Sequence, residues 1–258
     1  MYFYMDRPGP LHAMHPVTKT VALLGMFLAS LLIEHPLWAC VPLVVIMAGV
    51  IASGAWRNAI KLVGLLVLIT VLSVYIWTFV YTADAGDVFY TVRGWSIPRR
   101  SFLFGLGMGI RLSVMLLAGL VFLASTRVED FTGGLHRAGL PYGLCFGLGL
   151  SFRLLPTFLE VVGTVREAQK SRGLDLDTGG PIAKARKHLP LLVPVFISSI
   201  RRSDDMALAL ESRGFGRSNP RTYLRNYDVG LRDVVLLLIV AMLLVFLIWL
   251  RAHNIGRV

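Results

Sequence analysis

The sequence predicts an all-α integral membrane protein with about five transmembrane helices, plus cytoplasmic or interfacial helices between spans four and five. Three observations predict this class. Of the 258 residues, 55% are hydrophobic and 16% are charged, against about 45–50% and about 25% in soluble domains. Five apolar runs have the length of a membrane span, which is about 17–25 residues. Lysine and arginine gather in the segments that would face one side of the membrane.

The apolar runs follow a polar, turn-rich N-terminal segment. They cover about 17–33, 37–53, 60–80, 102–124 and 234–250. The first two are only just long enough to span, and a polar loop at 82–101 separates the third from the fourth. We therefore expect three parts: a bundle of four spans (1–125), a cytoplasmic region with two long helices (126–228) and a C-terminal transmembrane helix (229–258).

The distribution of charge sets the orientation. The stretch between Arg127 and Arg232 holds 16 of the 26 lysines and arginines. With this stretch in the cytoplasm, five spans place the N-terminus inside and the C-terminus outside. The inside segments then carry 20 basic residues and the outside segments carry 5, as the positive-inside rule requires. The orientation in the membrane therefore explains most of the net charge of +11. Binding to a nucleic acid is not needed to account for it.

The cytoplasmic region contains one short and two long predicted helices. Thr126 and Glu129 have the spacing of a capping box that opens the short helix. The long helices cover about 142–172, with a kink at Pro156, and about 189–213. Each starts with an apolar half too short to span, which should lie at the interface or pack against partner helices. An alternative, a sixth span at 143–163, would put the two helix ends on opposite sides of the membrane.

Both long helices end in one phrase, Ala-x-x-Ser-Arg-Gly followed by an apolar residue. The matched positions are Ala168, Ser171, Arg172 and Gly173, and then Ala209, Ser212, Arg213 and Gly214. For a single copy, a glycine cap behind a basic helix end is a sufficient structural explanation. Two matched copies predict a two-pronged docking surface, in which each arginine offers a fork of donors to a carboxylate. A dimer of ATPase domains would provide two such sockets.

Other features favour structural roles. Arg111 lies within the fourth span, where we expect a hydrogen bond inside the bundle more than an ion path. Gly105, Gly107 and Gly109 indicate close helix packing. No nucleophile, acid–base pair, metal spacing or ATP-binding motif stands out in the sequence. We therefore expect no catalytic residues, no bound cofactor and no metal ligands.

The sequence resembles the transmembrane T component of energy-coupling factor (ECF) transporters, the vitamin- and metal-uptake branch of ABC transporters. The resemblance covers nearly the whole chain, and the two Arg-Gly phrases are its most specific part. The family phrase is usually Ala-Arg-Gly, and serine takes the place of that alanine here. The supporting segments are Pro10-Leu11-His12, Pro16-x-Thr18-Lys19, Thr126-x-x-Glu129-Asp130, Gly139-Leu140-Pro141, Ser151-Phe152-Arg153-Leu154-Leu155-Pro156 and Arg201-Arg202-Ser203-Asp204-Asp205-Met206-Ala207.

The resemblance implies a multi-pass subunit of a prokaryotic cell membrane, with the N-terminus and the coupling region in the cytoplasm. Its two arginine ends would insert into two ABC ATPase subunits, which bind the ATP. Its apolar helix faces would hold one substrate-binding membrane protein, the S component, for uptake of a vitamin or a transition-metal ion. We assign that contact and the helix kink to Leu148, Phe152, Pro156, Leu192 and Phe196. The alternative is a membrane scaffold that docks an ATPase without belonging to an importer.

Overall fold

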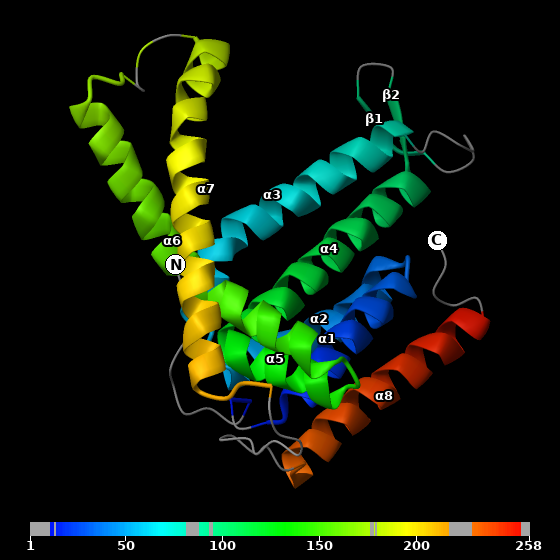
Figure 1. Ribbon diagram of the computed structural model, residues 1–258. Helices are drawn as coiled ribbons and strands as arrows, with labels where there is room; N and C mark the ends of the chain where they lie inside the picture. Colours follow the sequence, from blue (N-terminus) through cyan, green and yellow to red (C-terminus); the bar gives the residue numbers. More distant parts are fainter. Residues whose placement is uncertain are drawn as a thin grey trace. The chain divides into compact units, whose positions relative to one another are not determined.

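Helices make up most of the chain that the computed structural model describes, which covers residues 11–12, 14–80, 88–92, 95–175, 178, 180–216 and 229–253. In chain order the elements are α1 (Pro16–Leu31), α2 (Pro36–Ala52), α3 (Trp56–Val80), β1 (Val88–Val92), β2 (Trp95–Pro98), α4 (Arg99–Ser125), α5 (Val128–Arg137), α6 (Tyr142–Ser171), α7 (Pro181–Ser212) and α8 (Leu231–Ala252). Figure 1 shows these elements. The predicted all-α class is confirmed, and one short antiparallel hairpin, β1–β2, is added within the predicted polar loop.

All five predicted apolar runs form helices, namely α1, α2, α3, α4 and α8. Among the described residues, α3, α4, α6 and α8 are long and apolar enough to cross a membrane, whereas α1 and α2 are shorter apolar helices. Both short helices begin in the same way. His15 and His35 are extended N-cap residues, and the proline that follows each occupies the first helical turn, where its fixed φ and missing N–H cost nothing.

The turn between α1 and α2 shows how far these short helices reach. Gly107 of α4 lies directly against the backbone carbonyl of Glu34 in this turn. Gly107 is 18 residues from the end of α4 at Ser125, or about 27 Å at 1.5 Å per residue. This is close to the thickness of the hydrocarbon core, about 30 Å. The hairpin α1–α2 is therefore long enough to cross the membrane as two marginal spans.

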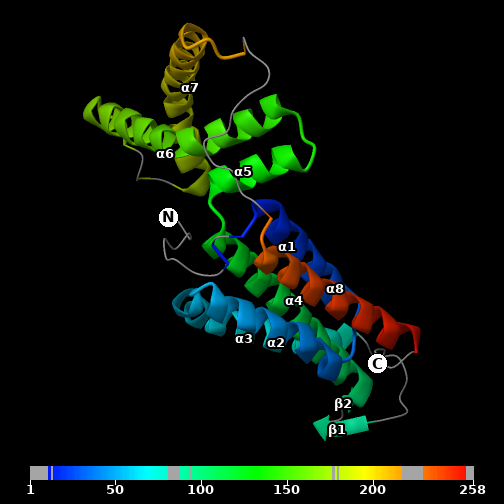
Figure 2. The ribbon, with the colours of Figure 1, turned by 90° about the horizontal axis from the view of Figure 1, so that it is seen from below.

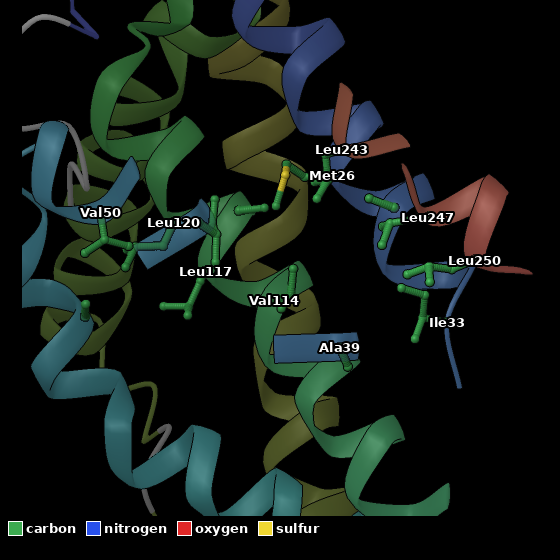
Figure 3. Close-up of a cluster of buried hydrophobic side chains, with 14 residues drawn as sticks. Met26, Ile33, Ala39, Val50, Val114, Leu117, Leu120, Leu243, Leu247 and Leu250 are labelled. Atoms are coloured by element: carbon green, nitrogen blue, oxygen red, sulfur yellow. The ribbon is translucent and has the colours of Figure 1, made fainter. Parts of the chain in front are cut away.

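Helix α4 lies at the centre of a bundle with α1, α2, α3 and α8, which Figure 2 shows side by side. Buried apolar side chains from α1, α2, α4 and α8 meet in a common core (Figure 3), which includes Met26, Ile33, Val50, Val114, Leu117 and Leu247. Only 11% of the apolar stretch of α3 is buried, so α3 presents most of its apolar surface outward. An exposed apolar surface of this extent is typical of a lipid-facing helix.

Glycines let α3 and α4 approach closely. A Cβ atom on Gly105 would lie 2.8 Å from the Cα of Val74, and one on Gly109 would lie 2.7 Å from the Cα of Thr70. At the same crossing the Ser73 hydroxyl donates to the Gly105 carbonyl at 2.9 Å. The prediction that the glycines of this span serve close helix packing is confirmed. In lipid such contacts replace the hydrophobic force that drives packing in water.

Arg111 binds the end of α1. Its Nε donates to the Ser30 carbonyl at 2.9 Å, and its second guanidinium nitrogen donates to the carbonyls of Leu31 at 3.2 Å and Ile33 at 2.7 Å. The Ser30 and Leu31 carbonyls belong to the last turn of α1 and have no partner within their own helix, and the Ile33 carbonyl lies in the turn that follows. The expected hydrogen bond inside the bundle is therefore confirmed, and Arg111 acts as a side-chain cap for α1.

Replacing Arg111 with methionine should destabilise the bundle. Each buried carbonyl left without a donor costs about 1–3 kcal/mol, so the midpoint of thermal unfolding in detergent should fall clearly. Arg100→Met is the matched control, because Arg100 is an exposed arginine in the first turn of the same helix. Equal unfolding midpoints for the two variants would contradict the capping role of Arg111.

Contacts divide the chain into two compact units. We call residues 1–140 with 227–258 the bundle unit and residues 141–226 the arm unit. The arm unit contains α6 and α7. Helix α6 agrees with its predicted bounds and continues through Pro156.

Two local predictions are wrong. Helix α7 begins at Pro181, about eight residues before the predicted start, because Gly180 is an extended N-cap and Pro181 takes the first turn. The capping box at Thr126 is not formed. The Thr126 N–H still donates to the Phe122 carbonyl of α4 at 2.9 Å. Thr126 therefore lies one residue before the N-cap position of α5, which Arg127 occupies. Helix α5 starts after Arg127, and the Thr126 hydroxyl has no hydrogen-bond partner within the described residues.

Candidate functional site

The two long helices form an antiparallel hairpin, with α6 and α7 as its arms. In Figure 1 the chain runs along α6 in one direction and along α7 in the opposite direction. At the far end of α7, the Phe215 ring lies 4.4 Å from the Phe146 ring and 6.2 Å from the Tyr142 ring, both in the first turns of α6. The two Ser-Arg-Gly phrases therefore lie at opposite ends of the hairpin. Their separation is up to about 45 Å, the length of the 30 residues of α6.

The first phrase ends α6 with a helix-stop geometry known as the Schellman motif. Gly173 has a φ of +90°, which a residue with a Cβ rarely adopts. Its N–H donates to the Lys170 carbonyl at 2.9 Å, and the Leu174 N–H donates to the Gln169 carbonyl at 3.0 Å. These two bonds are the ones that define the motif. Beyond it, Thr178 is held to α7, because Lys187 donates to the carbonyl and the hydroxyl of Thr178.

The second phrase repeats this geometry at the end of α7. Gly214 has a φ of +71°. Its N–H donates to the Glu211 carbonyl at 2.8 Å, and the Phe215 N–H donates to the Leu210 carbonyl at 2.9 Å. The predicted glycine caps are present at both ends. Gly139 of α5 has a similar cap with a φ of +107°, so the cap alone does not distinguish the two phrases.

The arginines distinguish the two phrases from an ordinary helix stop. Arg172 and Arg213 are both exposed, and neither side chain makes a hydrogen bond or an ion pair within the described residues. The small residues around them, Ala168 and Ala209 one turn earlier, are exposed as well. The hydroxyl groups of the adjacent serines already form hydrogen bonds within their own helices. Ser171 donates to the Glu167 carbonyl, and Ser212 donates to the Ala209 carbonyl. Each end thus presents one available guanidinium on a rigid cap.

Exposed apolar stripes run along residues 144–159 of α6 and 189–200 of α7. On α6 the stripe comprises Leu144, Leu148, Phe152, Leu155 and Leu159, which are 42–61% exposed. On α7 it comprises Leu189, Val193, Phe196 and Ile200, which are 56–64% exposed, with Leu192 beside it at 49%. The spacing of three and four residues keeps each stripe on one helix face. Of the residues assigned to a membrane partner, four are therefore exposed, and Pro156 is half-buried.

A groove with a mixed polar and apolar lining lies between the arms. Besides Val161, Val165, Met206 and Ala209, its lining includes the polar residues Glu160, Thr164, Arg201, Arg202 and Asp205. At 100° per residue these positions lie on the opposite face of each helix from its apolar stripe. Each arm is therefore amphipathic, and its groove face carries these polar residues among smaller apolar ones.

Comparison with known proteins identifies the family. A sequence model of the CbiQ family, described as cobalt transport protein, matches residues 9–224. The chain belongs to the CbiQ family. Similar proteins include the energy-coupling factor transporter transmembrane protein EcfT of Acidaminococcus fermentans, 28% identical over 253 residues that cover 93% of this chain and 92% of that protein. The EcfT proteins of Thermosediminibacter oceani, 28% identical over 90% of this chain and 89% of that protein, and of Lactococcus lactis subsp. cremoris, 26% identical over 95% and 96%, are further examples.

Membership of the CbiQ family confirms the resemblance inferred from the sequence. The chain is a multi-pass membrane protein of a transport family, and its role is that of a transmembrane component of an energy-coupling factor transporter, without catalysis of its own. Among the described residues, no cluster of three or more histidine, cysteine, aspartate or glutamate side chains could hold a metal ion.

Sequence reasoning missed a polar cluster in the bundle unit of this CbiQ protein. Arg137 of α5, His15 before α1 and Asp233 of α8 form it, and we call it the His15 clamp. The Arg137 guanidinium lies 3.0 Å from His15 Nε2, and the His15 backbone N–H donates to Asp233 Oδ1 at 2.8 Å. His15 and Asp233 are 7% and 2% exposed. The one sequence signal was Asp233 itself, an acidic residue in the first turn of an apolar helix.

The chemistry of the clamp favours a neutral His15. Burial and the positive charge of Arg137 lower the pKa of the His15 imidazole, and the carboxylate of Asp233 opposes the shift. The Val17 N–H also points at His15 Nδ1, at 3.2 Å. Since a neutral imidazole has one acceptor nitrogen, the ring accepts from either Arg137 or Val17 in a given tautomer. A protonated ring could accept from neither.

Acidification should therefore weaken the bundle through His15. The pKa of His15 is lower in the folded protein than in the unfolded chain, where it is about 6.5. The neutral imidazole therefore stabilises the fold above about pH 6.5, and this contribution to the free energy of unfolding is lost as the pH falls toward the folded-state pKa. The midpoint of thermal unfolding in detergent should fall between pH 7.5 and pH 5.5, and His15→Asn should reduce this dependence. His35→Asn, the same change at the N-cap of α2, is the matched control. An unchanged pH dependence in His15→Asn would refute the role of this imidazole.

Proposed function

We propose that this chain is the energy-coupling membrane subunit of an ECF-type ABC importer for a vitamin or a transition-metal ion. In this role it transmits the closure of two ATPase subunits to a substrate-binding membrane protein. One observation carries the proposal, namely the two matched Ser-Arg-Gly ends. Both are capped in the same way, both expose their arginine, and they stand at opposite ends of a single hairpin.

Each arginine end docks into one ABC ATPase subunit. A separation of up to about 45 Å is too large for a single socket but fits two sockets on two subunits of a dimer. A guanidinium without an intramolecular partner suits a carboxylate in such a socket, because two parallel N–H···O bonds form at once. The small alanine and serine side chains beside each arginine let the helix end enter closely.

The hairpin lies along the cytoplasmic surface of the membrane. Its ends point in opposite directions, so both can face the cytoplasm only when the arms run roughly parallel to the membrane plane. Helix α6 is long and apolar enough to span, but a spanning α6 would send Arg172 to the far side. The N-terminus and residues 126–228 are accordingly cytoplasmic, in agreement with the excess of basic residues in that region.

The apolar stripes receive the membrane partner. Leu148 and Phe152 of α6, and Leu192 and Phe196 of α7, expose large apolar side chains next to the membrane. Exposed apolar stripes on amphipathic helices bind lipid or another helix. We assign them to the S component, with Pro156 shaping the arm that carries the α6 stripe.

The hairpin converts ATP binding into motion of this partner. When ATP closes the two ATPase subunits, the two arginine ends are drawn together and the angle between the arms changes. The open groove between the arms leaves space for this change. The stripes move with the arms, tilt the S component in the membrane and release its substrate into the cytoplasm.

Purification of the assembled complex tests this function. The tagged chain is expressed with its genomic neighbours, and the proteins and small molecules that co-purify are identified by mass spectrometry. The complex is then placed in vesicles, and ATP-dependent uptake of the identified compound is measured, with cobalt(II) ions as a reference probe. We expect two ATPase subunits, one further membrane protein and ATP-driven uptake. Stable ATPase binding without uptake would instead indicate a scaffold outside any importer.

A further inference from the structure

The arm unit is joined to the bundle unit by two chain connections. The first leaves the bundle unit after Leu140, and the second returns to it at Tyr227. Helix α5 immediately precedes the first connection, and α8 begins four residues after the second. Any force that the arm unit exerts through the chain must therefore reach the bundle unit at α5 and at the start of α8.

The His15 clamp holds these two attachment points. Arg137 lies three residues before the first connection, and Asp233 lies six residues after Tyr227. His15 contacts both, with its ring toward Arg137 and its backbone N–H toward Asp233. The second carboxylate oxygen of Asp233 accepts the Gly230 N–H at 2.9 Å, which fixes the residue just before α8. One residue at the start of α1 therefore links the ends of both connections.

A close helix contact supports the same link. Gly134 of α5 lies against Pro16, where a Cβ atom would be 2.9 Å from the Pro16 Cβ and 3.4 Å from the Val17 nitrogen. Across the bundle end, Lys19 of α1 donates to the Ser125 carbonyl of α4 at 2.8 Å. The start of α1 is thus fastened to α4, α5 and α8 by contacts that are largely buried.

We propose that the His15 clamp is a positioning device for energy coupling, which joins the two attachment points so that α1, α5 and α8 respond to the arm unit as one body. This inference rests on the proposed function. With the clamp intact, closure of the ATPase subunits moves the arms against a fixed base. With the clamp open, the same closure pulls α5 away from α1 and α8, and ATP is hydrolysed without moving the substrate.

Two neighbouring glycines provide a matched test. Gly134→Ala forces α5 away from α1, whereas Gly133→Ala makes the same change on the same helix with nothing within 4 Å of the new Cβ. Each variant is assembled with its partner subunits in vesicles. ATP hydrolysis is measured together with uptake of the compound identified in the purified complex. We expect Gly134→Ala to keep partner binding and ATP hydrolysis but to lower the uptake per ATP by about fivefold or more, the lower end of typical allosteric couplings.

Asp233 provides a second, graded test. Asp233→Asn keeps a carbonyl oxygen for one of the two backbone donors, and Asp233→Ala keeps none. Uptake per ATP should fall in the order wild type, Asn, Ala. If Gly134→Ala matches Gly133→Ala, or if assembly, hydrolysis and uptake all fall in parallel in these variants, the clamp inference is overturned. Failure of the wild-type complex to take up substrate would instead reject the proposed function, so the two failures are distinguishable.

Discussion

The double variant Arg172→Glu with Arg213→Glu should lose its ATPase subunits. Both arginines are exposed and have no partner within the described chain, so the fold itself should be unaffected. Removing one partner of a desolvated charge pair at an interface costs about 2–5 kcal/mol. Two such losses lower the affinity at least about a thousandfold, and charge reversal adds repulsion. Co-purification of the ATPase subunits and ATP-driven uptake should both disappear.

A control with the same charge change separates position from charge. Arg153→Glu with Arg201→Glu reverses two exposed arginines on the same arms, away from the two helix ends. This variant should keep its ATPase subunits. Each single variant, Arg172→Glu or Arg213→Glu, should bind more weakly than wild type and more tightly than the double variant. Normal ATPase binding by the Arg172→Glu, Arg213→Glu protein would refute the assignment of the two ends.

The double variant Phe152→Asp with Phe196→Asp should lose the other partner. These rings are 48% and 64% exposed on the two apolar stripes, and a carboxylate buried against an apolar partner would remain unpaired. Removing an aromatic anchor from an interface costs about 2 kcal/mol or more, so the loss of two should weaken binding of the S component at least about a thousandfold. The ATPase subunits should remain bound, because the two helix ends are unchanged.

Phe152→Leu with Phe196→Leu is the conservative control for this experiment. Leucine keeps an apolar side chain, so most of the S-component binding should survive. The two charge experiments also control each other, since each should remove one partner and leave the other. Loss of the ATPase subunits from the aspartate variant, with the S component retained, would reverse our assignment of the two surfaces.

Sequence periodicity was sufficient for most of the helices, because apolar length and helix-stop residues act locally. The ends of α6 and α7 were predictable since Gly173 and Gly214 supply the positive φ that the caps require. The start of α7 was missed because residues 175–187 were interpreted as a polar linker, and the helix was expected to begin at about 189. In the structure Gly180 and Pro181 start the helix within this segment, although the turns that follow are polar.

Contacts between distant residues were less accessible to sequence reasoning. The location of Arg111 within a span indicated a hydrogen bond inside the bundle, but no local pattern identified the carbonyls at the end of α1 as its acceptors. The His15 clamp joins residues 218 positions apart and leaves no periodic signal. The sequence analysis also did not anticipate that Phe215, just after α7, packs against Phe146 at the start of α6.

The most direct test of the account is the distance between the two arginine ends. Spin labels are attached at Glu167→Cys and Leu208→Cys, matched exposed positions on the helix face away from each arginine, after the native Cys40 and Cys145 are replaced by alanine. The distance distribution in the complete complex is measured by pulsed electron paramagnetic resonance, without nucleotide and with a non-hydrolysable ATP analogue. The account predicts a shorter distance with the analogue. The same distribution in both states, in a complex shown to bind the analogue, would contradict it.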